Sequence, residues 1–280
     1  TLTEAVASGS QLLMLNLNGA GAGDEDGMHL PENCKWIEDG KKLVYVQPNQ
    51  DLVWRNASAS GIWNHDDANW QVEGYRNAIS FTDRDRVFFT DACTDGGDVQ
   101  ISGEVAPAHI EVNAESRDYV FSGNGKITGA TSLVKKGAGS LALATDNDFS
   151  GGVDLQQGTL RLQADRALGN SALKTESGTK LVVENAAAVA LNFAAADAPL
   201  KSDIEVADGA SLTLGGSYTA SSAVSLSGNG QFRFAAENGQ ILFSSVDEFG
   251  GDLVLSAARS SVTVSAAYSG TAALRVIGEE

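Results

Sequence analysis

Cysteine, histidine and basic residues are scarce in this sequence. Its 280 residues include 2 cysteines and 3 histidines, with 19 lysines and arginines against 36 aspartates and glutamates. The cysteines lack a Cys-x-x-Cys spacing and the histidines lie far apart in the sequence, which disfavours a zinc site. A net charge of −17 argues against a nucleic-acid partner, because phosphate binding requires a basic face. It also disfavours adsorption to anionic lipid.

Long apolar runs and helical periodicity are missing too. No segment approaches the roughly 18 apolar residues that a membrane helix needs. The first residues lack the basic start of a signal peptide and no Met begins the chain, so we expect a fragment whose targeting segments lie elsewhere. The best helix candidate is the alanine-rich stretch 186–196, and its interior, Val-Ala-Leu-Asn-Phe, fits a strand equally well.

Short alternating segments are abundant instead. From residue 99 onward, thirteen apolar-x-apolar triplets follow one another: Val99/Ile101, Ile110/Val112, Leu141/Leu143, Val153/Leu155, Leu160/Leu162, Leu181/Val183, Ile204/Val206, Leu212/Leu214, Val224/Leu226, Phe232/Phe234, Leu253/Leu255, Val262/Val264 and Leu274/Val276. A period of two places one face inward and the other outward. Glycine, asparagine, aspartate and serine between the triplets permit sharp turns.

Loose internal repetition indicates how these strands are arranged. Ser-Gly-Asn-Gly-Lys-Ile at 122–127 returns as Ser-Gly-Asn-Gly-Gln-Phe at 227–232, and 147–155 returns in outline at 247–255. So many very short strands are too many for one sandwich, whereas self-similarity over about 20–25 residues is typical of a solenoid. The sequence therefore predicts a β-solenoid, with Leu141, Leu143, Leu160 and Leu162 buried and Ser140, Arg161 and Gln163 exposed.

Residues 132–170 carry an ordered set of glycine, leucine and small polar positions. They are Lys135, Gly137, Gly139, Leu141, Leu143, Asn147, Phe149, Ser150, Gly151, Gly152, Gly158, Thr159, Leu160, Leu162, Ala167, Leu168 and Gly169. In this order and spacing the segment resembles the autotransporter-associated β-strand repeat. The upstream segment 52–70, with its three tryptophans, resembles the region that often precedes this repeat.

The resemblance implies a fold, a location and a route. It implies an all-β, right-handed parallel β-helix in the passenger domain of a type V secreted protein, at the surface or outside of a Gram-negative bacterium. It also implies transport through a C-terminal translocator β-barrel, which we expect in the parent protein and outside these residues. Residues 51–280 are then a β-helix passenger segment containing the repeat at about 132–170. Residues 1–50 end a preceding β-helical region or form an irregular cap.

Two acidic segments are candidates for a site. Asp24, Glu25 and Asp26 lie in the glycine-rich segment 19–27 and offer oxygen ligands for Ca²⁺. The spaced ligands of a calcium loop and the Lys-Ser/Thr ending of a phosphate loop are missing, which favours a flexible turn. The densest acidic stretch has five members: Asp83, Asp85, Asp91, Asp95 and Asp98.

Paired carboxylates on a β-helix wall suit the acid–base chemistry of polysaccharide lyases and hydrolases. Arg84 and Arg86 alternate with two of the aspartates of this stretch, which indicates neutralised surface strands instead. Trp54, Trp63 and Trp70 suit either stacking on sugar rings or a hydrophobic cluster, and the large area that tryptophan buries favours packing.

Cys34 and Cys93 are the only two cysteines. An oxidising cell exterior and an even count favour a disulfide between them. Closing a loop of about 60 residues contributes about 4 kcal/mol by the chain-entropy model. Against the bridge, a passenger that crosses a narrow barrel travels unfolded, and so large a closed loop would hinder passage.

The sequence predicts a structural or adhesive protein rather than an enzyme. Nearly every recognisable residue is explained as wall, corner or solvated face, and a Gly-x-Ser-x-Gly motif is absent. We therefore predict no catalytic residue, no metal ligand and no cofactor. The expected partners are a host surface protein or glycan, or sibling copies. Two alternatives stay open: a polysaccharide-acting β-helix enzyme that uses surface carboxylates, and a virion tailspike, which usually trimerises.

Overall fold

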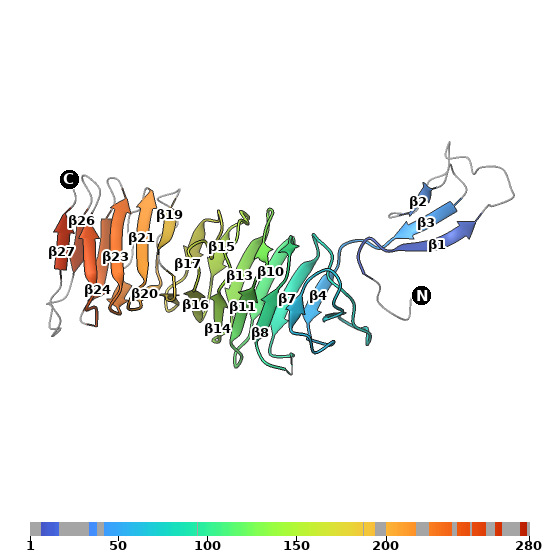
Figure 1. Cartoon of the computed structure of the whole chain (residues 1–280), viewed down its shortest axis with the longest axis horizontal. Helices are drawn as coiled ribbons and strands as arrows, with labels where there is room; N and C mark the ends of the chain where they lie inside the picture. The colour runs from blue at the N-terminus through green and yellow to red at the C-terminus, as the bar shows by residue number, and fades with distance from the viewer. Residues whose placement is uncertain are drawn as a thin grey trace.

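Short β-strands make up the regular structure of the part of the chain that we describe. The computed structural model describes residues 7–16, 34–37, 42–93, 95–186, 188–193, 200–216, 224–236, 240–246, 248–255, 261–264 and 275–278. These residues form an elongated stack of strands without a helix (Figure 1). In these ranges there is accordingly no helix of the length and apolarity needed to cross a membrane.

One wall of the stack is a seven-stranded sheet in the order β17-β15-β13-β10-β7-β4-β6. Its strands are β4 (Asp51–Trp54), β6 (Trp70–Val72), β7 (Arg86–Thr90), β10 (His109–Asn113), β13 (Ser132–Lys136), β15 (Val153–Leu155) and β17 (Leu173–Thr175). Farther along the chain, a five-stranded sheet in the order β19-β21-β23-β25-β27 consists of β19 (Val189–Phe193), β21 (Ser211–Gly216), β23 (Gln231–Ala236), β25 (Asp252–Leu255) and β27 (Arg275–Gly278).

A ten-stranded sheet runs along the molecule beside both of them. It consists of β5 (Ile62–Trp63), β8 (Asp98–Ile101), β11 (Tyr119–Gly123), β14 (Ser140–Leu143), β16 (Thr159–Leu162), β18 (Lys180–Val183), β20 (Asp203–Val206), β22 (Val224–Ser227), β24 (Gln240–Ser245) and β26 (Ser261–Val264). A further sheet of two strands pairs β9 (Glu104–Val105) with β12 (Lys126–Ile127).

Parallel pairing between successive coils makes this arrangement a β-solenoid. Ile110 pairs with Leu133, and Leu133 with Val153, so one coil takes 20 to 23 residues. Equivalent apolar residues stack along the axis. One such ladder is Leu52, Val87, Ile110, Leu133, Val153 and Leu173. The predicted all-β parallel β-helix is confirmed.

The inward alternation predicted from the triplets is confirmed as well. Twelve of the thirteen triplets lie wholly within strands, and the thirteenth begins at residue 274, outside the described residues. The predicted inward residues are all 0% exposed: Leu141, Leu143, Leu160 and Leu162. The stretch 186–196 contributes the strand β19 rather than a helix, since its apolar residues Val189 and Leu191 extend inward ladders.

The predicted outward residues Ser140, Arg161 and Gln163 are half-buried rather than exposed. Neighbouring coils cover them, because stacking brings polar side chains of adjacent coils together. Arg161 Nε and Gln163 Nε2 both donate to Glu184 of the next coil, at 2.7 and 2.9 Å. At these two outward positions, Arg161 and Gln163, the side chains thus pair with a residue of the next coil rather than standing free in solvent.

The N-terminal end of the solenoid differs from the rest. β6 pairs antiparallel with β4 and closes that edge of the sheet. Beyond it lies an antiparallel sheet of β1 (Gln11–Asn16), β3 (Lys42–Val46) and β2 (Cys34–Ile37) (Figure 1). Antiparallel pairing is not the pairing of a β-helix coil, so these strands do not continue the solenoid. The division of the chain at residue 50 stays a prediction.

Candidate functional site

A buried lysine braces a corner of the solenoid. Lys135 occupies an inward position of β13 and its side chain is 0% exposed. Its Nζ donates to the carbonyl oxygens of Lys136 and Gly137, both at 2.7 Å, and of Gln157 at 3.2 Å. Gln157 belongs to the next coil, so the ammonium group joins two coils. Burial lowers the pKa of Lys135 to about 8, since removal from water disfavours the charged form.

Glycine is required where the next coil passes this ammonium group. Gly158 has a φ of +74°. A Cβ there would lie 2.5 Å from the carbonyl oxygens of Gly137 and Gly139 and 2.8 Å from Lys135 Nζ. Such contacts are closer than van der Waals packing allows. Lys135, Gly137 and Gly139 of one coil and Gly158 of the next thus meet at a single tightly packed corner of the solenoid.

A buried asparagine, twelve residues after Lys135, forms hydrogen bonds to three successive coils. Asn147 is 1% exposed, and its Oδ1 accepts the N–H of Ile127, in the preceding coil, at 2.8 Å. Its Nδ2 donates to the carbonyl oxygens of Thr145 at 2.9 Å and of Ala167, in the following coil, at 2.7 Å. Phe149, two residues later, is 0% exposed. Lys135 and Asn147 therefore both form hydrogen bonds with backbone groups that are buried inside the wall.

Residues 133–162 match the family model described as passenger-associated-transport-repeat. This segment holds the corner of Lys135 and the bridge of Asn147, and it is part of a parallel β-solenoid. Repeat and fold together fit an autotransporter passenger domain. A passenger repeat of this kind implies secretion or surface display. Comparisons of the chain with curated proteins and with solved structures gave no significant match.

Sequence reasoning matched Lys135 and Asn147 to the repeat at about 132–170 without placing either of them inside the wall. A signal for Lys135 was present, since it lies two residues after Leu133, on the same face of the strand. Apolar residues usually hold such positions, and a lysine there needs acceptors. The carbonyl groups that satisfy it lie 22 residues away in the case of Gln157, and local pattern alone could not supply them.

Three of the five aspartates of the acidic stretch, Asp83, Asp85 and Asp91, have separate partners in the solenoid. Asp83 is exposed, contacts His65 Nε2 at 2.9 Å and accepts the N–H of Ala106 at 3.0 Å. Asp95 and Asp98 are exposed as well. Across the described ranges no group of three or more acidic, histidine or cysteine side chains is placed to hold a metal ion.

Asp91 closes a turn of the following coil. Its carboxylate accepts the backbone N–H groups of Glu115 at 2.8 Å and Ser116 at 3.1 Å. The bond from Glu115 is the main reason that the pKa of Asp91 is lowered, since this bond favours the charged carboxylate. Asp91 thus has a structural partner in the neighbouring coil.

Asp85 corrects the expectation that this stretch forms neutralised surface strands. Its side chain is 0% exposed and accepts the N–H groups of Gln50 at 2.9 Å and Thr82 at 3.0 Å, together with the hydroxyl of Ser8. Burial raises the pKa of Asp85. Arg84 lies in a turn with a φ of +74° rather than in a strand. The surface interpretation fails here because a segment distant in sequence covers the carboxylate.

The three tryptophans pack inside the N-terminal end of the solenoid, as predicted. Trp54, Trp63 and Trp70 are each 0% exposed. The ring centroid of Trp70 lies 4.9 Å from that of Trp54 and 5.3 Å from that of Trp63, both edge-to-face, which is a favourable aromatic geometry. None of these rings presents a face to solvent, so stacking on sugars is excluded in this arrangement.

Two sequence candidates fall wholly or partly outside the described residues. Asp24, Glu25 and Asp26 are among the residues that the structure does not describe. Cys93 is a buried free cysteine whose Sγ lies 3.2 Å from the carbonyl oxygen of Asp95. For Cys34 the description covers the backbone in β2 but not the side chain. A disulfide between the two cysteines stays a prediction.

Ion pairs between successive coils follow the outer faces of the passenger solenoid. They include Lys136–Glu111 at 2.8 Å, Arg161–Glu184 at 2.7 Å, Lys174–Asp154 at 3.5 Å, Lys180–Glu205 at 2.6 Å and Lys201–Glu176 at 2.7 Å. Each pair alone contributes little to stability because it is partly solvated. Together they hold rows of side chains in register along the axis.

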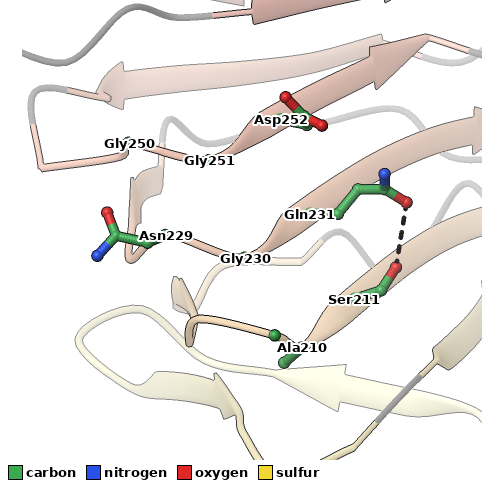
Figure 2. A pocket seen from close by; sticks show the side chains of 9 residues that line it. Ala210, Ser211, Asn229, Gly230, Gln231, Gly250, Gly251 and Asp252 are labelled. Carbon is green, nitrogen blue, oxygen red and sulfur yellow. Dashed lines mark hydrogen bonds between the residues drawn. The ribbon is translucent and has the colours of Figure 1, made fainter.

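A shallow groove of about 420 Å³ crosses three stacked corners near the C-terminal end (Figure 2). Its floor is backbone, since a Cβ on Gly251 would lie 1.7 Å from the carbonyl oxygen of Gly230. Ser211, Gln231 and Asp252 pair in register along one side, and Gln231 Oε1 accepts the Ser211 hydroxyl at 3.4 Å. The close approach of the coils explains this groove without a ligand.

Proposed function

We propose that this chain is a segment of a surface-displayed passenger with a structural and adhesive role. Its partners are a host surface protein or glycan, or sibling copies, and contact is spread over the side faces of the solenoid. The parent protein would carry the translocator that brings the passenger across the outer membrane. In this role the solenoid acts by its shape, as a stiff body that displays the same type of surface coil after coil.

The main support for this proposal is that outward-facing residues of successive coils stack in register along the solenoid axis. Lys180 pairs with Asp203 in register, and Thr159 pairs with Lys180, so one type of position recurs at the spacing of adjacent strands, about 4.8 Å. A repeated surface lets weak contacts add up when many copies are displayed. This supports binding by extended faces rather than by a single deep pocket.

We also propose that the chain performs no hydrolysis or elimination on polysaccharides. The reason is that the best acidic candidates already have structural partners: Asp85 holds Ser8, and Asp91 holds the turn at Glu115. A carboxylate engaged in this way is not available as a general acid or base. The competing enzyme would need two carboxylates that are both without structural partners and that lie at the separation acid–base chemistry on a glycosidic bond requires.

Sedimentation across a salt series, with a parallel enzyme assay, tests the proposal. A body of net charge −17 repels its copies, and screening reaches about 8 Å at physiological ionic strength. Self-association should therefore strengthen as salt rises from low values, and no reducing ends should accumulate from defined glycans. A chain that stays monomeric at every salt concentration and releases reducing ends would favour the enzyme. A stable trimer at every concentration would favour the tailspike.

A further inference from the structure

The outer face of the ten-stranded sheet is interrupted between β22 and β24. Val224 pairs with Phe243, whereas Ser225 pairs with Ser245. β24 therefore carries one extra residue, Ser244, which is exposed. A bulge of this kind bends the strand and breaks the ladder of the outer face. A hollow of about 380 Å³ opens here, with Ser225 and Ser245 among its lining residues.

Short polar side chains from four successive coils surround this hollow. The residues that line it are Lys180, Asp203, Ser225, Leu226, Ser227, Ser245 and Glu248. Ser225 donates its backbone N–H to Asp203 Oδ1 at 2.8 Å, and the Ser227 hydroxyl donates to the carbonyl oxygen of Ile204 at 3.3 Å. Three of the seven lining residues are serines, whose short side chains occupy little of the hollow.

The hollow carries more negative than positive charge. Lys180 Nζ is already paired with Glu205 at 2.6 Å. Asp203 and Glu248 are both exposed, and both line the hollow. The hollow thus combines two carboxylates with three serine hydroxyls. Two carboxylates are fewer than the ligand set of a calcium site.

We propose that this hollow binds one residue of a neutral or amine-bearing saccharide. Sugar hydroxyls donate to carboxylates and exchange hydrogen bonds with serine hydroxyls, which both donate and accept. The volume lies within the range of small-ligand sites, about 300–1,000 Å³. Anionic saccharides are rejected because the hollow and the whole chain are negative. This inference rests on the proposed adhesive function, and it specifies saccharides as the ligands of the outer face of the ten-stranded sheet.

Titration with three tetrasaccharides tests the proposal. The probes are a neutral glucose tetramer, an amine-bearing glucosamine tetramer and an anionic galacturonate tetramer, each followed by calorimetry or by chemical-shift changes. The first two should bind to the purified chain and the third should not. Ser225→Trp fills the hollow and should weaken both interactions at least about tenfold, as loss of one well-formed contact predicts.

Charge variants make the test independent of folding. Glu248 is exposed, so Glu248→Gln should keep the fold, and it should weaken the glucosamine tetramer about tenfold while affecting the glucose tetramer less. Asp208→Asn is the matched control, since Asp208 is exposed in a turn outside the hollow and its replacement should leave both affinities unchanged.

Several outcomes would overturn the proposal. They are no binding of either favoured probe, preference for the galacturonate tetramer, tighter binding of an oligolysine peptide, or affinities that Glu248→Gln and Asp208→Asn change equally. If these results appear while the chain still self-associates in the salt series, the saccharide site is wrong and the adhesive function stands. If the chain also fails to self-associate, both the saccharide site and the adhesive function are wrong.

Discussion

Asp85 accepts a hydrogen bond from the hydroxyl of Ser8, 77 residues earlier in the chain. The same carboxylate holds the backbone N–H groups of Gln50 and Thr82. One buried side chain therefore joins the N-terminal segment, the approach to β4 and the turn before β7. This contact lies where the antiparallel N-terminal sheet meets the first parallel coil.

Replacing this carboxylate should destabilise the N-terminal end of the solenoid. Asp85→Ala leaves the buried N–H groups of Gln50 and Thr82 without an acceptor, which should lower the free energy of unfolding by about 3 kcal/mol. Urea denaturation followed by tryptophan fluorescence measures this, because Trp54 lies in β4, which pairs with β7 directly after Asp85. Asp95→Ala, at an exposed position, is the control. Equal midpoints for the two variants would contradict the assigned role.

The buried lysine should make stability depend on pH in the alkaline range. The folded pKa of Lys135 is lowered from 10.5 to about 8, so the folded state releases its proton at a lower pH than the unfolded chain. The free energy of unfolding should therefore rise as the pH increases from 8 to 10.5, by about 3 kcal/mol relative to Lys135→Met. This gain is lost as the pH falls from 10.5 to the folded pKa of about 8. Lys136→Met, at the neighbouring outward position, should retain the dependence, and an unchanged pH profile in Lys135→Met would refute the assignment.

Loss of the asparagine bridge should weaken the passenger repeat. Asn147→Ala leaves the N–H of Ile127 and the carbonyl group of Ala167 unpaired in a buried site, and about 3 kcal/mol should be lost. Hydrogen exchange should show faster exchange at Ile127 than in the wild type, since that amide loses its acceptor. Asn124→Ala, at an exposed turn, should leave exchange unchanged, and matching profiles for the two variants would sink the prediction.

A charge placed in an inward ladder should be far more costly than one on a turn. Leu160 pairs with Leu141 and Leu181 in neighbouring coils, so Leu160→Asp buries a carboxylate among apolar side chains and should cost several kcal/mol. Gln157→Asp, whose side chain is exposed, adds the same charge at the corner. Thermal melting monitored by circular dichroism compares them. A wild-type melting curve for Leu160→Asp would mean that the in-and-out register is wrong.

The two cysteines give a prediction that intact mass can decide. We expect a Cys34–Cys93 disulfide in natively secreted protein, where the exterior is oxidising. Under non-reducing conditions an alkylating reagent should then add no mass, and reduction should expose two reactive thiols. Two alkylatable thiols before reduction would refute the bridge and would favour passage of the unfolded chain without a closed loop.

The wall of the solenoid could be predicted from the sequence because its signal is local. Alternation of apolar and polar residues determines which face of a short strand is buried, as for Leu160 and Leu162, and glycine marks where the chain must turn closely. The order of lysine, glycine, asparagine and leucine positions between about 132 and 170 was sufficient to indicate the repeat. These features depend on neighbours a few residues apart, and the sequence displays them directly.

Only the tertiary structure shows which hydrogen-bond partners the buried polar residues of that wall have. Lys135 needs the carbonyl group of Gln157, Asn147 needs the backbone of two adjacent coils, and Asp85 needs Ser8. The hollow beside Ser225 likewise depends on a shift in pairing with β24. In each case the partner lies about one coil or more away in sequence. Stacking of the coils brings such groups together, and only that stacking determines whether a buried polar group finds its partner.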